Sequence, residues 1–480
     1  MPLLPWIGAK WSGHRTVRIA LMGSKSSGKT VFLTAVANHL ANHNPEAFNL
    51  GGIGVHCDRT TMAGGKKEPF ARFDFLGART AYRNGEWPEK TSEPTVLSLP
   101  LALRNAKTGK QEDVLFEIMD IPGERVADFS MFGKSYRQWC AWMESELAGP
   151  GGSSPSYRSY LRESGKISPA DPAAARSALF SAYREFLADE YESFSANIVP
   201  STVKLEPDGT KHGGATRQAF LEAIRDVPLG IRDKKGVARE FVPVPPSFFD
   251  PGSPWKKNVH EFADAYGKYV KTVVHPLEKW LNDATKLYYL VDVPALLQAG
   301  PRAWSSERSY GEAAIGMLCR RRSGNLLKRL GTGMLGLLVR TRIHSVGVVA
   351  TKADLILPDG RDNLGVLAGN LLANVLGDKD SRVFVCAAVC STRETVAEIG
   401  GHRTLALSGR VVKADGTTEN ATWIPPSVPL HPPANTEKWR AAAAEGRFDY
   451  PGTLPFVDPE LEWPTEHLGL NAVVKDMLSR

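Results

Sequence analysis

The hydrophobic positions near the start of the chain form two successive patterns, a continuous run and then a one-sided helical repeat. Thr16–Met22 (TVRIALM) is a short apolar run of the β type that ends at a glycine. A stretch of glycine and serine follows. Apolar residues then recur at helical spacing at Val31, Leu33, Val36 and Leu40. This order predicts a strand, a glycine-rich loop and a helix.

Two further apolar runs, Thr95–Leu103 and Asp113–Met119, are separated by a short turn rich in lysine, glycine and threonine, which predicts an antiparallel hairpin. Later in the chain, strand and helix patterns alternate. The expected elements are a strand at Leu287–Val293, a helix near Ser306–Arg329, a strand at Ile343–Ala350, a helix near Asp362–Leu376 and a strand at Arg382–Val389. Such alternation predicts an α/β fold with a mostly parallel sheet flanked by helices.

The segment between these parts has a helical character. Helices are expected at Tyr136–Ala148, from Asp171-Pro172 onward, and at Asn258–Lys279. Asp171 is suited to cap its helix, because aspartate accepts backbone N–H bonds there and proline fits the first turn. The apolar face of that helix is formed by Leu179, Phe180, Tyr183, Phe186, Leu187 and Tyr191. We interpret the segment as a helical insertion domain.

The chain from residue 396 is rich in proline, and it contains a pattern that fits a hairpin at 405–423 and a final helix at Leu470–Leu478. The expected organisation is a core in two parts, 14–133 and 284–395, with the helical insertion at 134–283. A C-terminal extension, 396–480, is expected to pack on this core.

Composition makes some classes of protein less favourable. The chain has 480 residues, of which 42% are hydrophobic and 23% charged, as in ordinary globular proteins. Its five cysteines show no CxxC spacing, so neither a disulfide framework nor a zinc site is expected. No signal-peptide pattern opens the sequence, and the longest apolar stretch, Leu330–Val339, is shorter than the ~18 residues that a membrane span needs. These features predict a soluble, cytoplasmic protein.

The formal net charge of +7 permits weak attraction to anionic surfaces. The densest basic cluster comprises Arg320, Arg321, Arg322, Lys328 and Arg329, and it is interpreted as a solvated helix face. Peripheral membrane contact stays open as an alternative. The sequence carries no specific nucleic-acid signal.

The glycine-rich loop fits the pattern GxxxxGK[ST] in the strand–loop–helix context that the motif requires. Backbone N–H groups of such a loop bind a phosphate, and the helix N-terminus adds partial positive charge. Lys29 is expected to bridge the β- and γ-phosphates, and the Thr30 hydroxyl to ligate Mg²⁺. The residues predicted to bind nucleotide here are Gly23, Ser24, Lys25, Ser26, Ser27, Gly28, Lys29, Thr30 and Val31. These features predict a P-loop NTPase fold.

A DxxG segment, Asp120 to Gly123, directly follows the predicted hairpin. Asp120 is expected beside the phosphate loop as a partner of Mg²⁺, and the Gly123 N–H is placed to sense the γ-phosphate. Glu124 stands where many GTPases have a glutamine that orients the attacking water. A catalytic role for Glu124 competes with a structural one, as a helix cap or in an ion pair with Arg125.

Thr351, Lys352, Ala353 and Asp354 fit the pattern [NT]KxD at the end of a later strand. The Asp354 carboxylate can accept hydrogen bonds from guanine N1–H and the exocyclic amine, donors that adenine does not present at those positions. Because an unpaired buried carboxylate is costly, such a site discriminates strongly. Thr351 and Lys352 complete the predicted base site, with the Lys352 stem on the base plane.

Two assignments rest on fewer residues. The backbone of Ala388 and Val389 is expected to meet the base oxygen. A switch threonine that closes over Mg²⁺ is expected before the hairpin, and Thr91 and Thr95 are both candidates.

Taken in order, several segments make the chain resemble the YcjX-like family of stress-associated P-loop GTPases. These segments are RIALMGSKSSGKTVFLTAVANHL, WPEKTS, FEIMDIPGE, YYLVDVPALLQAGP, VVATKADLI, AAVCSTRETV and the late PGTLP. The resemblance implies a GTPase-like core with an added helical region, and GTP or GDP bound with magnesium. It implies phosphate binding by Gly23–Thr30, γ-phosphate sensing by Asp120–Glu124 and base binding by Thr351–Asp354. It also favours Thr91 as the switch threonine.

The chain departs from the family pattern at two points. DIPGER stands where a DYPGEW-like segment is expected, and Cys390 stands where a basic residue is expected. The second departure weakens the assignment of the loop that contains Ala388 and Val389.

The leading hypothesis is a slow, Mg²⁺-dependent GTP hydrolase that acts as a molecular switch in a stress response and signals to a protein effector that the sequence does not identify. Slow turnover is expected because the sequence identifies no arginine finger, and Arg125 and Arg393 are only candidates. Two alternatives stay open. One is a small-molecule kinase that uses the same phosphate loop, and the other is a nucleotide-binding scaffold without turnover.

Overall fold

The computed structural model describes most of the chain. The described residues are 15–24, 26–57, 70–89, 91, 93–149, 154–192, 198–205, 216–319, 343–376, 380–399, 401–413, 415–456 and 466–479. Lys25, the basic cluster at 320–329 and the apolar stretch at 330–339 lie outside these ranges. Among the described helices, none has both the length and the apolar character that crossing a membrane requires.

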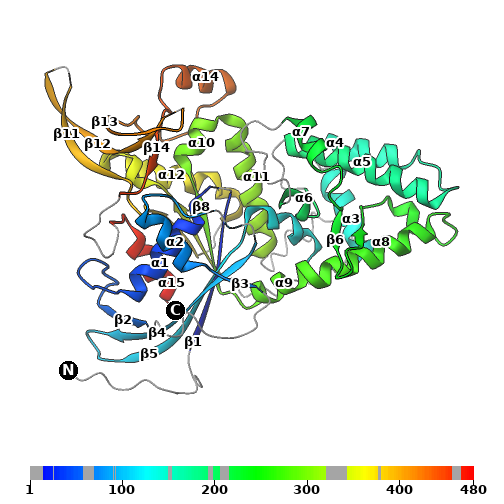
Figure 1. Cartoon of the computed structure of the whole chain (residues 1–480), viewed down its shortest axis with the longest axis horizontal. Helices are drawn as coiled ribbons and strands as arrows, with labels where there is room; N and C mark the ends of the chain where they lie inside the picture. The colour runs from blue at the N-terminus through cyan, green and yellow to red at the C-terminus, as the bar shows by residue number, and fades with distance from the viewer. Residues whose placement is uncertain are drawn as a thin grey trace.

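A mixed, mostly parallel sheet forms the centre of the molecule (Figure 1). Its strands are β1 (Arg15–Gly23), β2 (Ile53–Cys57), β3 (Ala71–Arg72), β4 (Thr95–Asn105), β5 (Gln111–Asp120), β8 (Lys286–Val291), β9 (Ser345–Ala350) and β10 (Asp380–Val385). In the described part of the chain their order is β10-β9-β8-β1-β5-β4-β2, with β3 beside β4. The strands from β10 to β5 pair in parallel, whereas β4 pairs antiparallel with β5 and with β2. The α/β class and the predicted hairpin are confirmed.

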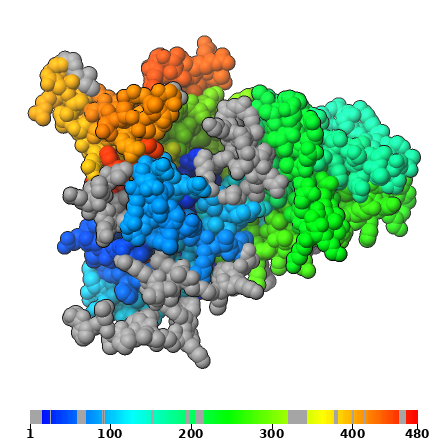
Figure 2. Space-filling view, in the orientation of Figure 1, coloured from blue at the N-terminus to red at the C-terminus, as the bar shows by residue number. Residues whose placement is uncertain are grey.

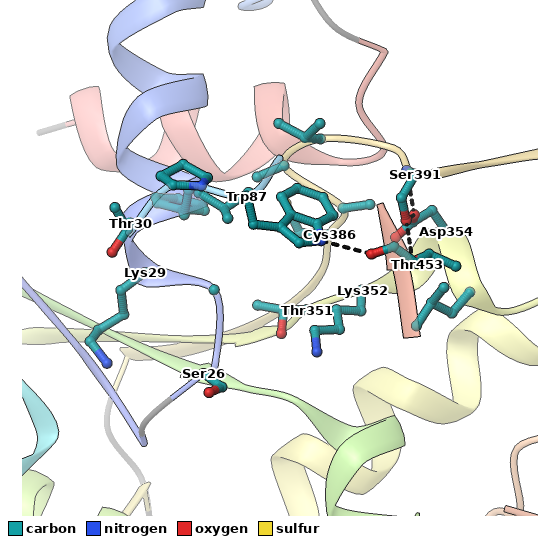
Figure 3. Close-up of a pocket in the computed structure, with 18 of the residues that line it drawn as sticks. Ser26, Lys29, Thr30, Trp87, Thr351, Lys352, Asp354, Cys386, Ser391 and Thr453 are labelled. Carbon is teal, nitrogen blue, oxygen red and sulfur yellow. Dashed lines mark hydrogen bonds between the residues drawn. The ribbon is translucent and has the colours of Figure 1, made fainter. Parts of the chain in front are cut away.

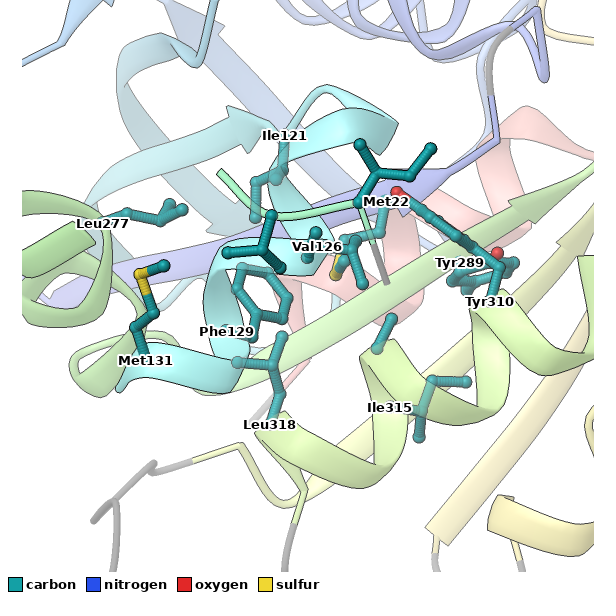
Figure 4. Packing of buried hydrophobic residues seen from close by; sticks show 14 of the residues in the cluster. Met22, Ile121, Val126, Phe129, Met131, Leu277, Tyr289, Tyr310, Ile315 and Leu318 are labelled. Atoms are coloured by element: carbon teal, nitrogen blue, oxygen red, sulfur yellow. The ribbon is translucent and has the colours of Figure 1, made fainter. Parts of the chain in front are cut away.

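Helices cover both faces of this sheet. They are α1 (Lys29–Ala41), α2 (Phe75–Arg83), α10 (Val293–Ala299), α11 (Pro301–Leu318), α12 (Arg361–Leu371), α13 (Ala373–Leu376) and α15 (Leu470–Leu478). Alternate residues of β1 explain this arrangement, because successive side chains of a strand point to opposite faces. Ile19 and Leu21 join the core that includes α1 and α15, whereas Met22 joins the core that includes α11. Figure 4 shows Met22 and Tyr289 from the sheet beside Tyr310, Ile315 and Leu318 of α11.

The insertion forms a lobe at one side of the sheet (Figures 1 and 2). Its helices are α3 (Tyr136–Leu147), α4 (Pro155–Ser164), α5 (Pro172–Glu192), α6 (Thr202–Leu205), α7 (Arg217–Ala223), α8 (Lys256–Tyr269) and α9 (His275–Asn282), with a π-helical turn at Val270–Val274. Asp171 accepts the N–H groups of Ala173 and Ala174 at the start of α5, as its N-cap pattern predicts. The lobe also holds a small antiparallel sheet, β6 (Gly230–Arg232) with β7 (Ala238–Glu240), which the sequence analysis does not predict.

Aromatic side chains fill the core of the insertion. On α5, the predicted apolar face is buried at Leu179, Phe180, Tyr183, Phe186 and Leu187. Tyr191 is half-buried and stacks on Phe220 of α7, with the ring centroids 4.0 Å apart. The helical character of this segment is therefore confirmed.

Near the C-terminus a second sheet stands beside the main one. It contains β11 (Thr392–Ile399), β12 (His402–Val412), β13 (Thr418–Trp423) and β14 (Gly452–Leu454), and α14 (Thr436–Ala444) follows β13. The β12–β13 pair confirms the hairpin expected at 405–423, and α15 confirms the final helix. Strand β11 crosses the position between residues 395 and 396, so the division of the chain there stays a proposal.

Several expected elements have different bounds. The strand expected at Leu287–Val293 ends at Val291, because Val293 already belongs to α10. The helix expected near Ser306 begins earlier, as α10 and α11, since Asp292 caps α10 and a glycine, Gly300, separates the two helices. The helix expected near Asp362–Leu376 is divided into α12 and α13. The strand expected at Arg382–Val389 is wrong beyond Val385, because its partner β9 ends at Ala350 and Ala387 then forms an isolated bridge with Leu468. Ala388 and Val389 therefore lie in a loop.

Candidate functional site

A cavity of about 510 Å³ lies where several parallel strands of the main sheet end, which is where open α/β sheets bind ligands. The residues that line it are Ser26, Gly28, Lys29, Thr30, Val31, Phe32, Trp87, Pro88, Thr91, Asp120, Pro122, Gly123, Glu124, Thr351, Lys352, Asp354, Leu355, Cys386, Ala387, Ala388, Val389, Ser391, Pro451, Gly452 and Thr453. Figure 3 shows Lys29 and Thr30 at one side of this cavity and Asp354, Ser391 and Thr453 at the other.

The glycine-rich loop depends on glycine at both ends. At Gly23, a Cβ atom would lie 2.5 Å from Leu290 O and 2.6 Å from Ser27 Oγ, so only glycine allows β1 to turn here. At Gly28, φ is +92° and the residue opens α1 with space beside it. Ser26 also adopts a left-handed φ, +68°. Left-handed residues that alternate with others along a turn direct successive backbone N–H groups into a common concavity, the geometry that binds anions.

Lys29 and Thr30 are positioned by this loop and the first turn of α1. The Lys29 ammonium is buried and donates to two carbonyl oxygens of the loop, Gly23 O at 2.9 Å and Ser24 O at 3.0 Å. The Thr30 and Thr91 hydroxyl oxygens lie 3.2 Å apart. Thr91 and Thr95 are both candidates for the switch threonine, and the family resemblance favours Thr91. Thr91 faces Thr30 in the cavity, whereas Thr95 begins β4 and is not among the lining residues.

Asp120, at the end of β5, is fully buried, and neither of its carboxylate oxygens has a well-formed hydrogen bond among the described residues. Burial raises the pKa of Asp120, and the nearby Lys29 ammonium and Thr91 hydroxyl oppose that effect. A buried carboxylate with unused acceptor capacity, beside the hydroxyls of Thr30 and Thr91, presents the oxygen donors that Mg²⁺ prefers. These three residues therefore fit a magnesium ion.

The chain turns immediately after Asp120 into a 3₁₀ helix, η2 (Gly123–Met131), and this turn brings Gly123 and Glu124 to the cavity wall. Arg125 points elsewhere. Its guanidinium is buried, pairs with Glu93 and donates to Ser201 Oγ in the insertion. Arg393, the second arginine considered as a finger, lies near Glu466 and over the ring of Phe456. Neither arginine is among the residues that line the cavity.

The opposite side of the cavity is built by the segment after β9. Thr351 Oγ1 donates to Ser27 O at 3.1 Å, so this segment is fixed directly to the glycine-rich loop. Lys352 adopts a left-handed φ of +60°, an uncommon conformation for a residue with a side chain, and its ammonium pairs with Asp292 at 2.5 Å. Backbone conformations of this kind are concentrated at functional sites.

Asp354, in the short 3₁₀ helix η5 (Ala353–Leu355), is buried at the same side. Its Oδ2 accepts both the backbone N–H and the hydroxyl of Ser391, each at 2.7 Å. Burial raises the pKa of Asp354, and the two bonds from Ser391 oppose that effect.

The structure brings most of the predicted residues together. Fourteen of them line the cavity: Ser26, Gly28, Lys29, Thr30, Val31, Thr91, Asp120, Gly123, Glu124, Thr351, Lys352, Asp354, Ala388 and Val389. Gly23, Ser24 and Ser27 belong to the loop without lining the cavity, and Lys25 lies outside the described residues.

Sequence reasoning missed other lining residues, among them Trp87, Ser391 and Thr453. All three lie in segments that carry the family resemblance, namely WPEKTS, AAVCSTRETV and PGTLP. That presence was the only signal that could have pointed to them.

Comparison with known proteins gives a consistent result. A model of the YcjX-like family, DUF463, matches residues 17–211 and 235–479. The chain belongs to the YcjX-like family. Every residue that lines the cavity falls within the matched ranges, whereas α7 and β6 fall in the gap between them.

Two curated relatives of this YcjX-like chain carry the name Ras-like GTPase YcjX. The protein of Shewanella oneidensis is 29% identical over 157 residues, which are 28% of this chain and 32% of the relative. The protein of Escherichia coli is 30% identical over 172 residues, 33% of this chain and 36% of the relative. The aligned regions thus span about a third of each curated relative.

Proposed function

We propose that this YcjX-like chain binds GTP and GDP with Mg²⁺ and hydrolyses GTP slowly, as a P-loop GTPase. The observation that carries the proposal is the convergence of three separated motifs on one cavity. Lys29, Asp120 and Asp354 follow or end three different strands, and all three residues line the same space. The names of the two curated relatives support the same activity.

For the phosphates, the backbone N–H groups from Ser26 to Thr30 would hold the anion, with help from the positive end of α1. The Lys29 ammonium, which now donates to two loop carbonyls, would exchange these for β- and γ-phosphate oxygens. Bound Mg²⁺ would neutralise charge that develops on the phosphates during transfer. Thr30, Thr91 and Asp120 are the residues that would hold it.

For the base, the Asp354 carboxylate would accept guanine N1–H and the exocyclic amine. Ala388 and Val389 line the same cavity from a loop, not from a strand, and their backbone would meet the base oxygen. Lys352 would cover the base with its aliphatic stem. Adenine would offer the buried Asp354 carboxylate no donor from the base, at a cost of several kcal/mol or about 10⁴-fold in affinity for well-built sites of this kind.

For the hydrolysis step, Glu124 and Gly123 lie at the cavity wall after Asp120. Glu124 would orient the attacking water, and the Gly123 N–H would contact the γ-phosphate. The described residues that line the cavity include no arginine, and an arginine finger accounts for about 10³–10⁵-fold in related enzymes. Slow turnover by the isolated chain follows from this composition.

The switch hypothesis extends from the same segments. η2 begins at Gly123 and, through Arg125 and Asp128, contacts Ser201 and Tyr269 of the insertion. If the γ-phosphate orders η2, these contacts would transmit the change to the insertion. We propose that the surface of the insertion reports nucleotide state to a protein effector. The division into a core at 14–133 and 284–395, an insertion at 134–283 and an extension at 396–480 is part of this proposal. So are a cytoplasmic location and a role in stress response.

Calorimetric titration in the presence of Mg²⁺ tests the binding step. GTP and GDP are expected to bind and ATP is not, and Lys29→Ala is expected to abolish tight binding. Binding of ATP in preference to GTP would favour the small-molecule kinase, and unchanged affinity in Lys29→Ala would remove the glycine-rich loop from the site.

Phosphate release tests the chemical step. Slow but measurable release from GTP is expected, and its absence under saturating GTP and Mg²⁺ would favour the nucleotide-binding scaffold.

Hydrogen exchange tests the switch. Protection across 134–283 is expected to differ between GDP and a non-hydrolysable GTP analogue, and identical protection would contradict transmission into the insertion.

A further inference from the structure

A strand from the C-terminal part of the chain reaches the side of the cavity that holds Asp354. β14 pairs antiparallel with β12, with Thr453 opposite Val411. Pro451, Gly452 and Thr453 all line the cavity. The part of the chain expected only to pack on the core therefore contributes a wall of the site.

The side chain of Thr453 contacts the residue that supports Asp354. Ser391 Oγ lies 2.7 Å from Asp354 Oδ2 and 2.8 Å from Thr453 Oγ1. An ionised carboxylate only accepts hydrogen bonds, so the single hydroxyl hydrogen of Ser391 is directed to Asp354. The Thr453 hydroxyl is then the donor to Ser391 Oγ. Hydrogen bonds arranged in such a chain polarise and strengthen one another.

The backbone of Thr453 is fixed from the other direction. Trp87 Nε1 donates to Thr453 O at 2.7 Å, as Figure 3 shows. Trp87 belongs to the segment that carries Thr91, whose hydroxyl lies 3.2 Å from that of Thr30. Thr453 therefore lies between two groups, the carboxylate proposed to meet the base and the segment proposed to close over the metal.

We propose that Thr453 is a positioning residue for guanine recognition, which holds the Asp354 carboxylate through Ser391 while Trp87 holds β14 in place. This inference rests on the proposed function, because it takes the ligand of Asp354 to be a guanine nucleotide. It adds that discrimination between purines is set partly by a strand far along the chain from the [NT]KxD motif.

The competing interpretation is that β14 only closes the second sheet and shields the cavity from solvent. The two interpretations predict different effects of losing the Thr453 hydroxyl on the contact between Asp354 and the guanine exocyclic amine. If Thr453 orients Asp354, its loss weakens binding of GDP more than binding of inosine diphosphate, which lacks that amine. If β14 only shields the cavity, both nucleotides lose affinity by the same factor.

The test uses the full chain with Mg²⁺ and compares affinities for GDP and inosine diphosphate. Thr453→Val removes the hydroxyl at nearly constant volume, and the GDP-to-inosine-diphosphate affinity ratio is expected to fall about fivefold, the effect of one hydrogen bond. Thr453→Ser keeps the hydroxyl and is expected to restore the ratio. Thr422→Val, an exposed change on β13 outside the cavity lining, is the matched control and is expected to leave the ratio unchanged.

Trp87→Phe keeps an aromatic ring and removes the indole donor, so it is expected to lower the same ratio. An unchanged ratio in Thr453→Val, or equal ratios in Thr453→Val and Thr453→Ser, would overturn the inference. If the unsubstituted chain still bound GDP, the proposed function would stand. Absence of GDP binding by the unsubstituted chain would overturn both.

Discussion

The Arg125 guanidinium donates a 2.6 Å hydrogen bond to the Glu93 carboxylate, and this bond joins the segment before β4 to η2 after Asp120. The same guanidinium donates to Ser201 Oγ at 3.1 Å and lies 3.6 Å from Asp128 Oδ2. Asp128 in turn accepts the hydroxyl of Tyr269, at 2.9 Å. Two segments proposed to respond to the γ-phosphate are thus connected to the insertion through the buried Arg125 guanidinium.

Arg125→Ala is expected to destabilise the protein by about 3–5 kcal/mol. The Asp128 side chain is fully buried, and removing its charged neighbour leaves a buried carboxylate without its ion pair. Urea and thermal unfolding measure the loss. Burial raises the pKa of Asp128 and the Arg125 charge opposes this, so the carboxyl of the variant would also be easier to protonate.

The matched control is Arg176→Ala, which removes an ion pair on the surface of the insertion. Arg176 pairs with Glu261 at 2.9 Å, but both side chains are about half exposed, at 46% and 42%. Exposed pairs of this kind contribute about 0–1 kcal/mol, because water screens them. Equal losses in the two variants would show that the buried group around Arg125 has no special role in stability.

Asp354→Asn is expected to shift the nucleotide preference from guanine toward xanthine. The amide presents a donor where the carboxylate presents only acceptors, and xanthine carries a carbonyl oxygen where guanine carries the exocyclic amine. Competition between GDP and xanthosine diphosphate measures the preference. Retention of the original guanine preference would remove Asp354 from base recognition.

Glu124→Ala is expected to lower the rate of phosphate release from GTP by roughly 100-fold and to leave the affinity for GDP unchanged. The magnitude is that of a positioned general base or water-orienting group. Single-turnover phosphate release and GDP titration measure the two quantities. Full activity with a lower melting temperature would instead assign Glu124 to a structural role at the start of η2.

Glu307→Gln is expected to stabilise the protein increasingly as pH rises. Glu307 on α11 is buried, and Tyr289 donates to its Oε1 at 2.9 Å. Burial raises the pKa of Glu307, while the Tyr289 and Ser24 hydroxyls and the Lys29 charge oppose that effect. A glutamine oxygen can still accept the Tyr289 hydroxyl, so the substitution removes the charge and keeps the bond.

The sign of this pH dependence follows from linkage. A carboxyl whose pKa is higher in the folded state contributes stability below its unfolded pKa, near 4.5, and loses it as pH rises through the folded value. The stability difference between Glu307→Gln and the unsubstituted chain should therefore grow from about pH 5 to neutral pH. Unfolding by urea at a series of pH values measures it. A difference independent of pH would show that Glu307 keeps the same pKa in both states.

The sequence by itself determined the elements whose cause is local. An apolar run sets β1, and a helical repeat of apolar residues sets α1. Between them, the backbone at positions 23 and 28 is one that glycine adopts, and this sets the glycine-rich loop. The β4–β5 hairpin and α15 follow in the same way from periodicity and a short turn. These features depend on interactions between residues a few positions apart, which leave their pattern in the sequence. The three motifs GxxxxGK[ST], DxxG and [NT]KxD, and their order along the chain, can likewise be read directly from the sequence.

Only the tertiary structure decided which distant residues meet. Strand β10 ends at Val385 because its partner β9 ends at Ala350 and Ala387 then pairs with Leu468, and no local pattern records this. Trp87 and Ser391 come from separate segments, and both contact Thr453 only because β14 lies beside the cavity. The physical reason is that contacts between residues far apart along the chain depend on where whole elements pack, whereas periodicity and turn chemistry act over a few residues.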